Sequence, residues 1–100
     1  TDVLEKIKVR EKVDICEPAS FNIVYYNDDA TSASFVTESL ILFFNYDENH
    51  ALELTNRIHE TGSAIVATLP YEIAEQKTIE ILTLARSNGY PLVVKVEKNV

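Results

Sequence analysis

Three polar residues, Asn27, Asp28 and Asp29, lie where a short apolar run ends and a helical pattern begins. Short oxygen-bearing side chains are typical of turns and helix caps, because they satisfy backbone amides that have no partner there. Taken alone, the triplet therefore favours a cap. The same oxygens are also able to contact a ligand, and a histidine far along the chain makes that second interpretation worth testing.

That histidine, His59, lies near the end of a predicted helix, one turn after Thr55. A lone helical histidine is usually a surface residue, but it can also act as a base or as a hydrogen-bond partner for a bound ligand. The sequence contains no Gly-x-Ser-x-Gly elbow, no glycine-rich nucleotide loop and no paired-histidine metal motif. We therefore expect no enzyme, no metal site and no cofactor.

The composition indicates one globular domain, since 100 residues with 46% apolar content can bury one core. Nine basic residues against 16 acidic ones give a net charge of -7, which disfavours binding to nucleic acid. The single cysteine, Cys16, cannot form an internal disulfide. Without a long apolar run or a signal peptide, no membrane association is expected. We predict a cytoplasmic protein, or a plastid stromal one if a transit peptide was removed.

Residue patterns predict strands at residues 21–26, 63–69 and 92–96. Helices are predicted from residue 31 to about 44, from 48 to about 60, and from 71 to about 88. Thr31 and Asp47 are the expected N-caps of the first two helices, and Pro70 is expected in the first turn of the third. Gly62 and Gly89 follow helices and are expected to be left-handed.

The apolar face of the first helix is predicted to include Leu42, and that of the third to include Ile73 and the stem of Lys77. The element order predicts an α+β fold, β-α-α-β-α-β, in which a small three-stranded antiparallel sheet packs on three helices. Its first strand should lie between the other two and run antiparallel to both. Residues 1–19 are predicted to be a flexible N-terminal arm, and residues 20–100 the folded core.

Several short motifs occur at consistent spacing along the chain. They are Asn27-Asp28-Asp29 with Thr31 and Phe35-Val36, then Phe43-Phe44-x-Tyr46-Asp47, Ile58-His59-x-x-Gly62, Glu72-Ile73-Ala74-Glu75-x-Lys77 and Tyr90-Pro91-Leu92. Together these motifs resemble the ClpS family of adaptor proteins, which deliver N-degron substrates to Clp chaperone-protease machines. The resemblance covers about residues 21–98 and implies a fold like the C-terminal domain of the ribosomal stalk protein.

The resemblance implies a site for the free α-amino group of the first residue of a substrate, held by Asn27, Asp28 and His59. An ammonium group is a donor of three hydrogens, and these three side chains offer acceptors. Asp29 is expected to have the turn and capping role described above. The first side chain of the substrate, Leu, Phe, Tyr or Trp in the family, would enter an apolar pocket. The implied lining is Tyr25, Thr31, Ala33, Val36, Thr55, Ile58 and Leu92.

Two positions depart from the family, whose members commonly have methionine where this chain has Ala33 and Thr55. Ala33 should open the rim of the pocket, and Thr55 should add a hydroxyl and remove flexible apolar bulk. We therefore expect Ile or Val to be tolerated and Leu to bind less tightly.

The implied partner is the N-terminal domain of a ClpA- or ClpC-like AAA+ unfoldase. Glu72 and Lys77 match family positions that contact this domain, and residues 1–19 match the segment that engages the unfoldase. One alternative is a structural interaction module of the ribosomal-stalk type, which would have no ligand pocket. Another is a small hydrolase that uses His59 and Asp28, although it lacks a nucleophile and an oxyanion motif.

Overall fold

A computed structural model describes residues 20–99, and the predicted arm at residues 1–19 lies outside this range. The described chain contains three strands and three helices in the predicted order. They are β2 Ser20–Tyr26, α2 Ala33–Phe44, α3 Glu48–Thr61, β3 Ser63–Pro70, α4 Tyr71–Ser87 and β4 Val93–Lys98. No helix among the described residues is long and apolar enough to span a membrane.

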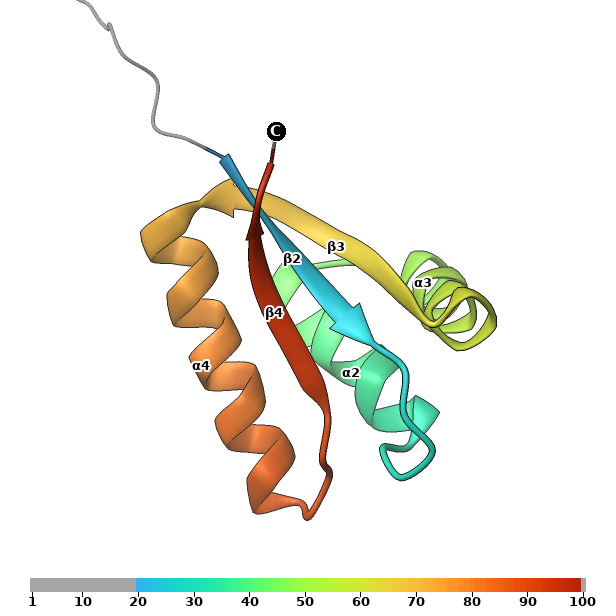
Figure 1. Ribbon diagram of the computed structural model, residues 1–100. Helices are drawn as coiled ribbons and strands as arrows, with labels where there is room; N and C mark the ends of the chain where they lie inside the picture. Colours follow the sequence, from blue (N-terminus) through green and yellow to red (C-terminus); the bar gives the residue numbers. More distant parts are fainter. Residues whose placement is uncertain (1–19, 100) are drawn as a thin grey trace, which may run out of the picture.

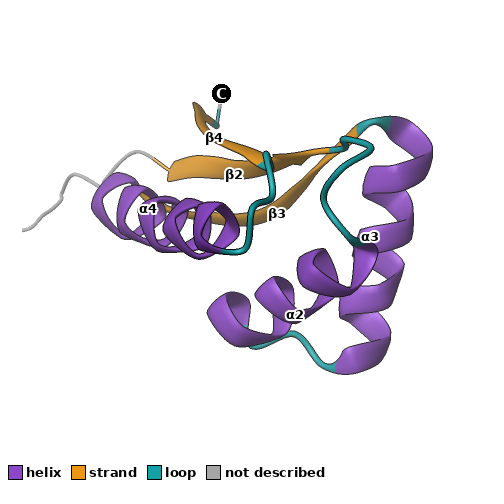
Figure 2. Cartoon of the chain, turned by 90° about the horizontal axis from the view of Figure 1, so that it is seen from below, coloured by secondary structure: helices purple, strands orange, loops and turns teal. Residues whose placement is uncertain are grey.

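The sheet has the order β3-β2-β4, and β2 runs antiparallel to both neighbours (Figure 1). The three helices lie on one side of the sheet, with α4 and α3 at opposite ends of this layer (Figure 2). Tyr26, the last residue of β2, pairs with Ser63 at the start of β3 and with Val93 at the start of β4. The predicted α+β fold and strand arrangement are confirmed.

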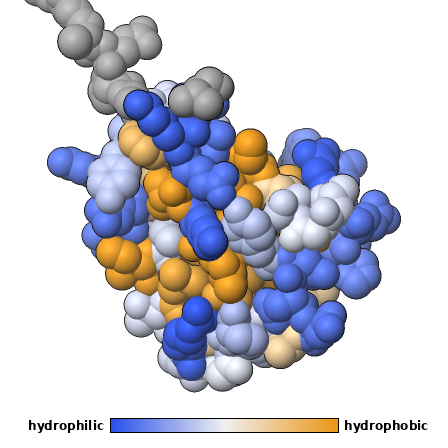
Figure 3. Space-filling view, viewed as in Figure 1, coloured by the Kyte–Doolittle hydropathy of each residue, from blue (hydrophilic) through white to orange (hydrophobic). Residues whose placement is uncertain are grey.

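Alternation along β2 separates the two faces of the sheet. Ile23 and Tyr25 belong to the core cluster beneath the helices, whereas Val24 is on the opposite face, in register with Ile65 of β3. Ile65 and Val93 of this outer face are exposed, and Figure 3 shows apolar surface there interrupted by polar side chains. Only the helical side of the sheet therefore holds the core.

A bulge interrupts the pairing of β2 with β3. Ile23 pairs with Ala67 and Val24 with Ile65, so Val66 is the extra residue of β3. The carbonyl of Val66 accepts a hydrogen bond from the Tyr46 hydroxyl, which comes from the connection between α2 and α3. The helical layer thus satisfies a carbonyl at the bulge.

The N-caps of two helices differ from the prediction by one residue. The N-cap of α2 is Ser32, whose Oγ accepts from Phe35 N at 3.1 Å, and not Thr31. Pro70 is itself the N-cap of α4 and the last residue of β3. Gly62 has the expected left-handed conformation, with φ +91°.

The end of α4 forms a Schellman motif around Gly89, which has φ +78°. Gly89 N donates to Arg86 O at 3.0 Å, and Tyr90 N donates to Ala85 O at 2.9 Å. The glycine was predicted at this left-handed position, and Asn88 is the residue that caps the helix.

Two side chains predicted on apolar helix faces point to solvent. Leu42 is 66% exposed and Ile73 is 48% exposed. The buried positions of α4 are instead Ala74, Thr78, Ile81 and Ala85. These four positions are spaced three or four residues apart and form one face of the helix. Thr78 is on this buried face although it is polar, whereas Ile73, which hydropathy favoured, is on an exposed face.

Candidate functional site

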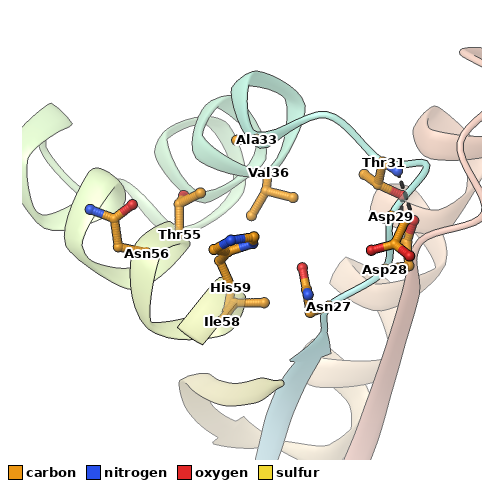
Figure 4. A pocket seen from close by; sticks show the side chains of 10 residues that line it. All are labelled: Asn27, Asp28, Asp29, Thr31, Ala33, Val36, Thr55, Asn56, Ile58 and His59. Carbon is orange, nitrogen blue, oxygen red and sulfur yellow. Dashed lines mark hydrogen bonds between the residues drawn. The ribbon is translucent and has the colours of Figure 1, made fainter. Parts of the chain in front are cut away.

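A pocket of about 360 Å³ lies between the β2–α2 loop, α2 and α3. It combines a polar loop with apolar side chains of the two helices (Figure 4). Its lining residues are Asn27, Asp28, Asp29, Thr31, Ala33, Val36, Thr55, Asn56, Ile58 and His59. Eight of the ten residues expected for the amine site and the apolar lining are therefore brought together here.

A backbone contact places the two ends of this site side by side. Asn27 N donates to the carbonyl of Gly62 at 2.9 Å, so the end of β2 is joined to the C-terminal cap of α3. His59 lies in the last turn of the same helix, one turn before that cap. The side chains of Asn27 and His59 consequently face one another across the pocket (Figure 4).

Asn27 and His59 are both exposed. Within residues 20–99, neither side chain makes a hydrogen bond to another group of the chain. An Asn carbonyl oxygen and a neutral His ring nitrogen are hydrogen-bond acceptors. Both side chains are therefore available to a ligand that enters from solvent.

Asp28 organises the loop that follows β2. Its Oδ1 accepts from Ala30 N at 2.8 Å and from Thr31 N at 2.7 Å, and its Oδ2 accepts from Thr31 Oγ1 at 2.7 Å. This is the role expected for Asp29, so that assignment was wrong. Asp29 is exposed and also lines the pocket, a role that its sequence position did not indicate.

The pKa of the Asp28 carboxyl is lowered. Partial burial alone would raise this pKa, but the hydrogen bonds from Thr31 and Ala30 and the positive charge of Arg86 outweigh that effect. Asp28 therefore stays ionised in mildly acidic solution and supplies a negative charge at the mouth of the pocket.

The apolar part of the pocket comes from α2 and α3. Val36 and Ile58 are buried, whereas Ala33 is exposed at the rim. Thr55 is buried as well, and its Oγ1 lies 2.8 Å from the Ala51 carbonyl oxygen and 2.7 Å from Thr37 Oγ1. The Thr55 hydroxyl is thus already bonded between the two helices, which sequence alone did not indicate.

Two residues expected in the lining lie behind it. Tyr25 is 0% exposed and Leu92 is 1% exposed, and both belong to the core. The Tyr25 hydroxyl is 2.8 Å from Ser39 Oγ, and burial raises the pKa of Tyr25 despite this bond. They support the pocket without lining it. Asn56 is also among the lining residues, although no motif in the sequence marks it.

Glu72 and Lys77 lie on α4, away from the pocket. Glu72 is exposed in the first turn of the helix. Lys77 Nζ donates to the Phe43 carbonyl at 2.8 Å and lies 5.7 Å from the centre of the Phe44 ring.

No group of three or more His, Cys, Asp or Glu side chains in the described residues is placed to hold a metal ion.

The fold and the site together define a small α+β binding protein whose pocket has a polar mouth and an apolar interior. A family described as ATP-dependent Clp protease adaptor protein ClpS matches residues 16–95. An adapter protein ClpS of Shewanella loihica is 36% identical over 95 residues, which cover 95% of this chain and 93% of the relative. One from Treponema denticola is 40% identical over 82 residues, which cover 82% and 81%.

A solved structure is similar as well. The Agrobacterium tumefaciens ClpS2 bound to L-phenylalaninamide superposes with a TM-score of 0.80 at 31% identity, covering 83% of this chain and 100% of that chain. The chain belongs to the ClpS family of Clp protease adaptors. The predicted function as a non-catalytic N-degron adaptor is confirmed, and the hydrolase and the pocket-free module are set aside.

Proposed function

We propose that the pocket binds the first residue of an N-degron substrate, with Asn27, Asp28 and His59 holding its free α-amino group. The observation that carries this proposal is that three acceptor side chains, two from the loop after β2 and one from α3, meet at the mouth of one pocket with an apolar interior. A chain-internal residue or an acetylated terminus has no ammonium group to satisfy these acceptors. The site thereby selects the end of a polypeptide.

The number of acceptors in the site equals the number of N–H donors on an α-ammonium group. An α-ammonium group carries three N–H donors. Asn27 Oδ1 and a His59 ring nitrogen each supply one acceptor, and the Asp28 carboxylate supplies the third together with its charge. Asp28 Oδ1 already accepts two backbone N–H groups, so Oδ2 is the atom that we assign to the ligand. Charge-assisted bonds of this kind are stronger than neutral ones.

The apolar interior is proposed to take the first side chain, as Leu, Phe, Tyr or Trp. The volume of about 360 Å³ lies within the range of about 300–1,000 Å³ for ligand pockets. Burying such a side chain is worth roughly 1.5–3 kcal/mol. After the costs of association, we expect a Kd on the order of micromolar or tighter. The open rim at Ala33 is expected to admit Ile and Val.

The related A. tumefaciens structure holds L-phenylalaninamide. This compound has a free α-amino group, an aromatic side chain and an amide where a peptide bond would continue, so it has the chemistry of an N-terminal Phe residue. Its presence in a family member with a similar fold supports the proposal for this chain.

The delivery step is proposed to use α4. Glu72 and Lys77 would dock on the N-terminal domain of a ClpA- or ClpC-like unfoldase in the cytoplasm. The Lys77 ammonium donates one hydrogen to Phe43 O, and its other hydrogens are available to an acceptor on the partner. Because α4 does not contribute to the pocket, substrate and unfoldase can be bound together.

Amine recognition is tested with a fluorescent peptide that begins with Phe or Leu, compared with its N-acetylated twin by anisotropy. We expect saturable binding of the free peptide only. Asn27→Ala and His59→Ala should each weaken it about tenfold or more, since each removes a bond to a charged group. Equal binding of the two peptides, or none, refutes the proposal.

Matched controls come from the start of α3, where Asn49 and His50 are exposed and outside the pocket. Asn49→Ala and His50→Ala should leave peptide affinity unchanged. If they weaken binding as much as the site variants, the site is misplaced.

The docking proposal has its own test. Glu72→Ala and Lys77→Ala should weaken binding to the N-terminal domain of the unfoldase without changing peptide affinity. Glu53→Ala, an exposed change on α3, is the control. Unchanged unfoldase binding in both α4 variants would contradict this assignment.

A further inference from the structure

Thr31 is bonded to both oxygens of the Asp28 carboxylate. Its backbone N donates to Oδ1 at 2.7 Å and its Oγ1 donates to Oδ2, also at 2.7 Å. Figure 4 shows the Thr31 side chain directed towards the aspartate. Thr31 is half-buried and lines the pocket. The family resemblance implied no more than a place for it in the apolar lining.

The hydrogen bonds leave the carboxylate with a defined free acceptor position. A carboxylate has about four lone-pair positions. Ala30 N and Thr31 N occupy both positions on Oδ1, and Thr31 Oγ1 occupies one on Oδ2. One position on Oδ2 remains. Thr31 donates from its backbone N to one oxygen and from its hydroxyl to the other. These two bonds fix the plane of the carboxylate and the direction of the remaining lone pair on Oδ2.

We infer that Thr31 is a positioning residue of the amine site, which holds the Asp28 carboxylate so that its one free lone pair meets the substrate ammonium. This inference rests on the proposed function. The single O–H hydrogen of Thr31 is donated to Asp28, so the contact that the structure gives this hydroxyl at the site is with the aspartate. The lowered pKa of Asp28 agrees with a carboxylate that is held in its ionised form.

The positioning role and a simple wall role predict opposite results for two conservative changes. Thr31→Val keeps the shape of the side chain and removes the hydroxyl. Thr31→Ser keeps the hydroxyl and removes the methyl group. A positioning residue is damaged by the first change, whereas an apolar wall residue is damaged by the second.

The test measures the affinity of a Phe-initiated free peptide for the intact chain and both variants by anisotropy. We expect Thr31→Val to bind about three- to tenfold more weakly, the range for one hydrogen bond, and Thr31→Ser to stay within about twofold of the natural chain. Weakening by Thr31→Ser with no effect of Thr31→Val overturns the inference, as does an equal effect of both.

A double-mutant cycle distinguishes a lost positioning bond from a loss of packing, because only the effect of the bond depends on the presence of Asp28. In an Asp28→Ala background, Thr31→Val should change affinity by less than about twofold, because the carboxylate that it positions is gone. A full additional three- to tenfold loss in that background contradicts the positioning role. Urea unfolding of every variant confirms that the compared chains are folded under the assay conditions.

The N-acetylated peptide separates the two possible failures. If the natural chain binds free and acetylated peptides equally, the amine site itself is wrong. If it binds only the free peptide but Thr31→Val binds as tightly as the natural chain, the amine site stands and Thr31 does not position it.

Discussion

The first turn of α2 sets the choice of substrate in our proposal, because Ala33 lies at the rim of the pocket and its side chain is exposed. A single methyl group there leaves space above the first side chain of a bound peptide. Ala33→Met would extend a flexible apolar side chain over this opening. Since Ala33 is exposed and outside the core cluster, the change should alter the free energy of unfolding by less than about 0.5 kcal/mol.

The expected effect has two parts. A Met side chain that folds over a bound Leu buries roughly one further methylene group, worth about 0.8 kcal/mol, so Leu should bind about fourfold more tightly. A β-branched Ile or Val has a second branch next to its backbone, which would meet the new side chain. Overpacking of this kind costs about 1–3 kcal/mol. The preference for Leu over Ile should therefore rise by about tenfold or more.

The assay is anisotropy with peptides that differ only in the first residue, Leu, Phe, Ile or Val. In the natural chain we expect Ile and Val to bind within about tenfold of Leu, a difference of about 1.4 kcal/mol. Ser34→Met is the control, because Ser34 is the exposed neighbour of Ala33 and does not line the pocket. The reasoning is refuted if the natural chain already rejects Ile and Val while binding Leu tightly, or if Ala33→Met leaves the preference unchanged.

Three further predictions concern the scaffold. Asp28→Asn should lower the free energy of unfolding by about 1 kcal/mol at neutral pH. Because the folded pKa of Asp28 is lowered, its stabilisation is present above the unfolded pKa and is lost as the pH falls through the folded one, so urea titrations should show the two chains converging in acid. Tyr25→Phe should cost about 1 kcal/mol through its bond to Ser39 and leave peptide affinity unchanged, whereas a clear loss of affinity would return Tyr25 to the lining. Gly62→Ala should lower stability by about 1 kcal/mol in thermal melts, because φ is +91° there although no atom within 4 Å would meet the new methyl group, and an unchanged melt would contradict this.

The order of helices and strands was predictable because local signals agree with the tertiary structure over most of the chain. Asp47 and Gly62 mark the two ends of α3, and short aromatic or β-branched runs mark the strands. The outward direction of Leu42 and Ile73 was not predictable from hydropathy. Their helices are apolar on more than one side, so the sheet and the neighbouring helix decide which residues are buried.

The candidate site was predictable as a set of residues, with exceptions that have a common cause. Tyr25 and Leu92 were expected in the lining because they match positions that line the pocket in the family that the sequence resembles. In β2 the inward side chains lie under the helical layer, so Tyr25 is covered, and Leu92 precedes β4 on the same buried side. A match to a family position does not reveal whether a side chain reaches the surface of the pocket or lies in the core behind it.

The turn bonds are made by Asp28 and not by the predicted Asp29 because of loop geometry that residue types do not encode. Either aspartate is able to accept from the following backbone amides, which is the usual mechanism of such turns. The conformation of the loop gives Asp28 the amides of Ala30 and Thr31 and leaves Asp29 exposed. Ser32 caps α2 by accepting from Phe35 N, one residue beyond the predicted Thr31, whose hydroxyl donates to Asp28.

The Asp28 carboxylate has both a structural role and, in our proposal, a ligand-binding role. The same carboxylate closes the loop after β2 and, in our proposal, receives the substrate ammonium. Any Asp28 variant therefore loses turn stability and ligand contact together, and its weaker binding does not distinguish them. Thr31→Val removes one bond to the carboxylate while retaining its charge, so comparison with Asp28→Ala separates the position of the charge from its presence. A large loss for Asp28→Ala with a smaller one for Thr31→Val would show that charge and orientation contribute separately to amine recognition.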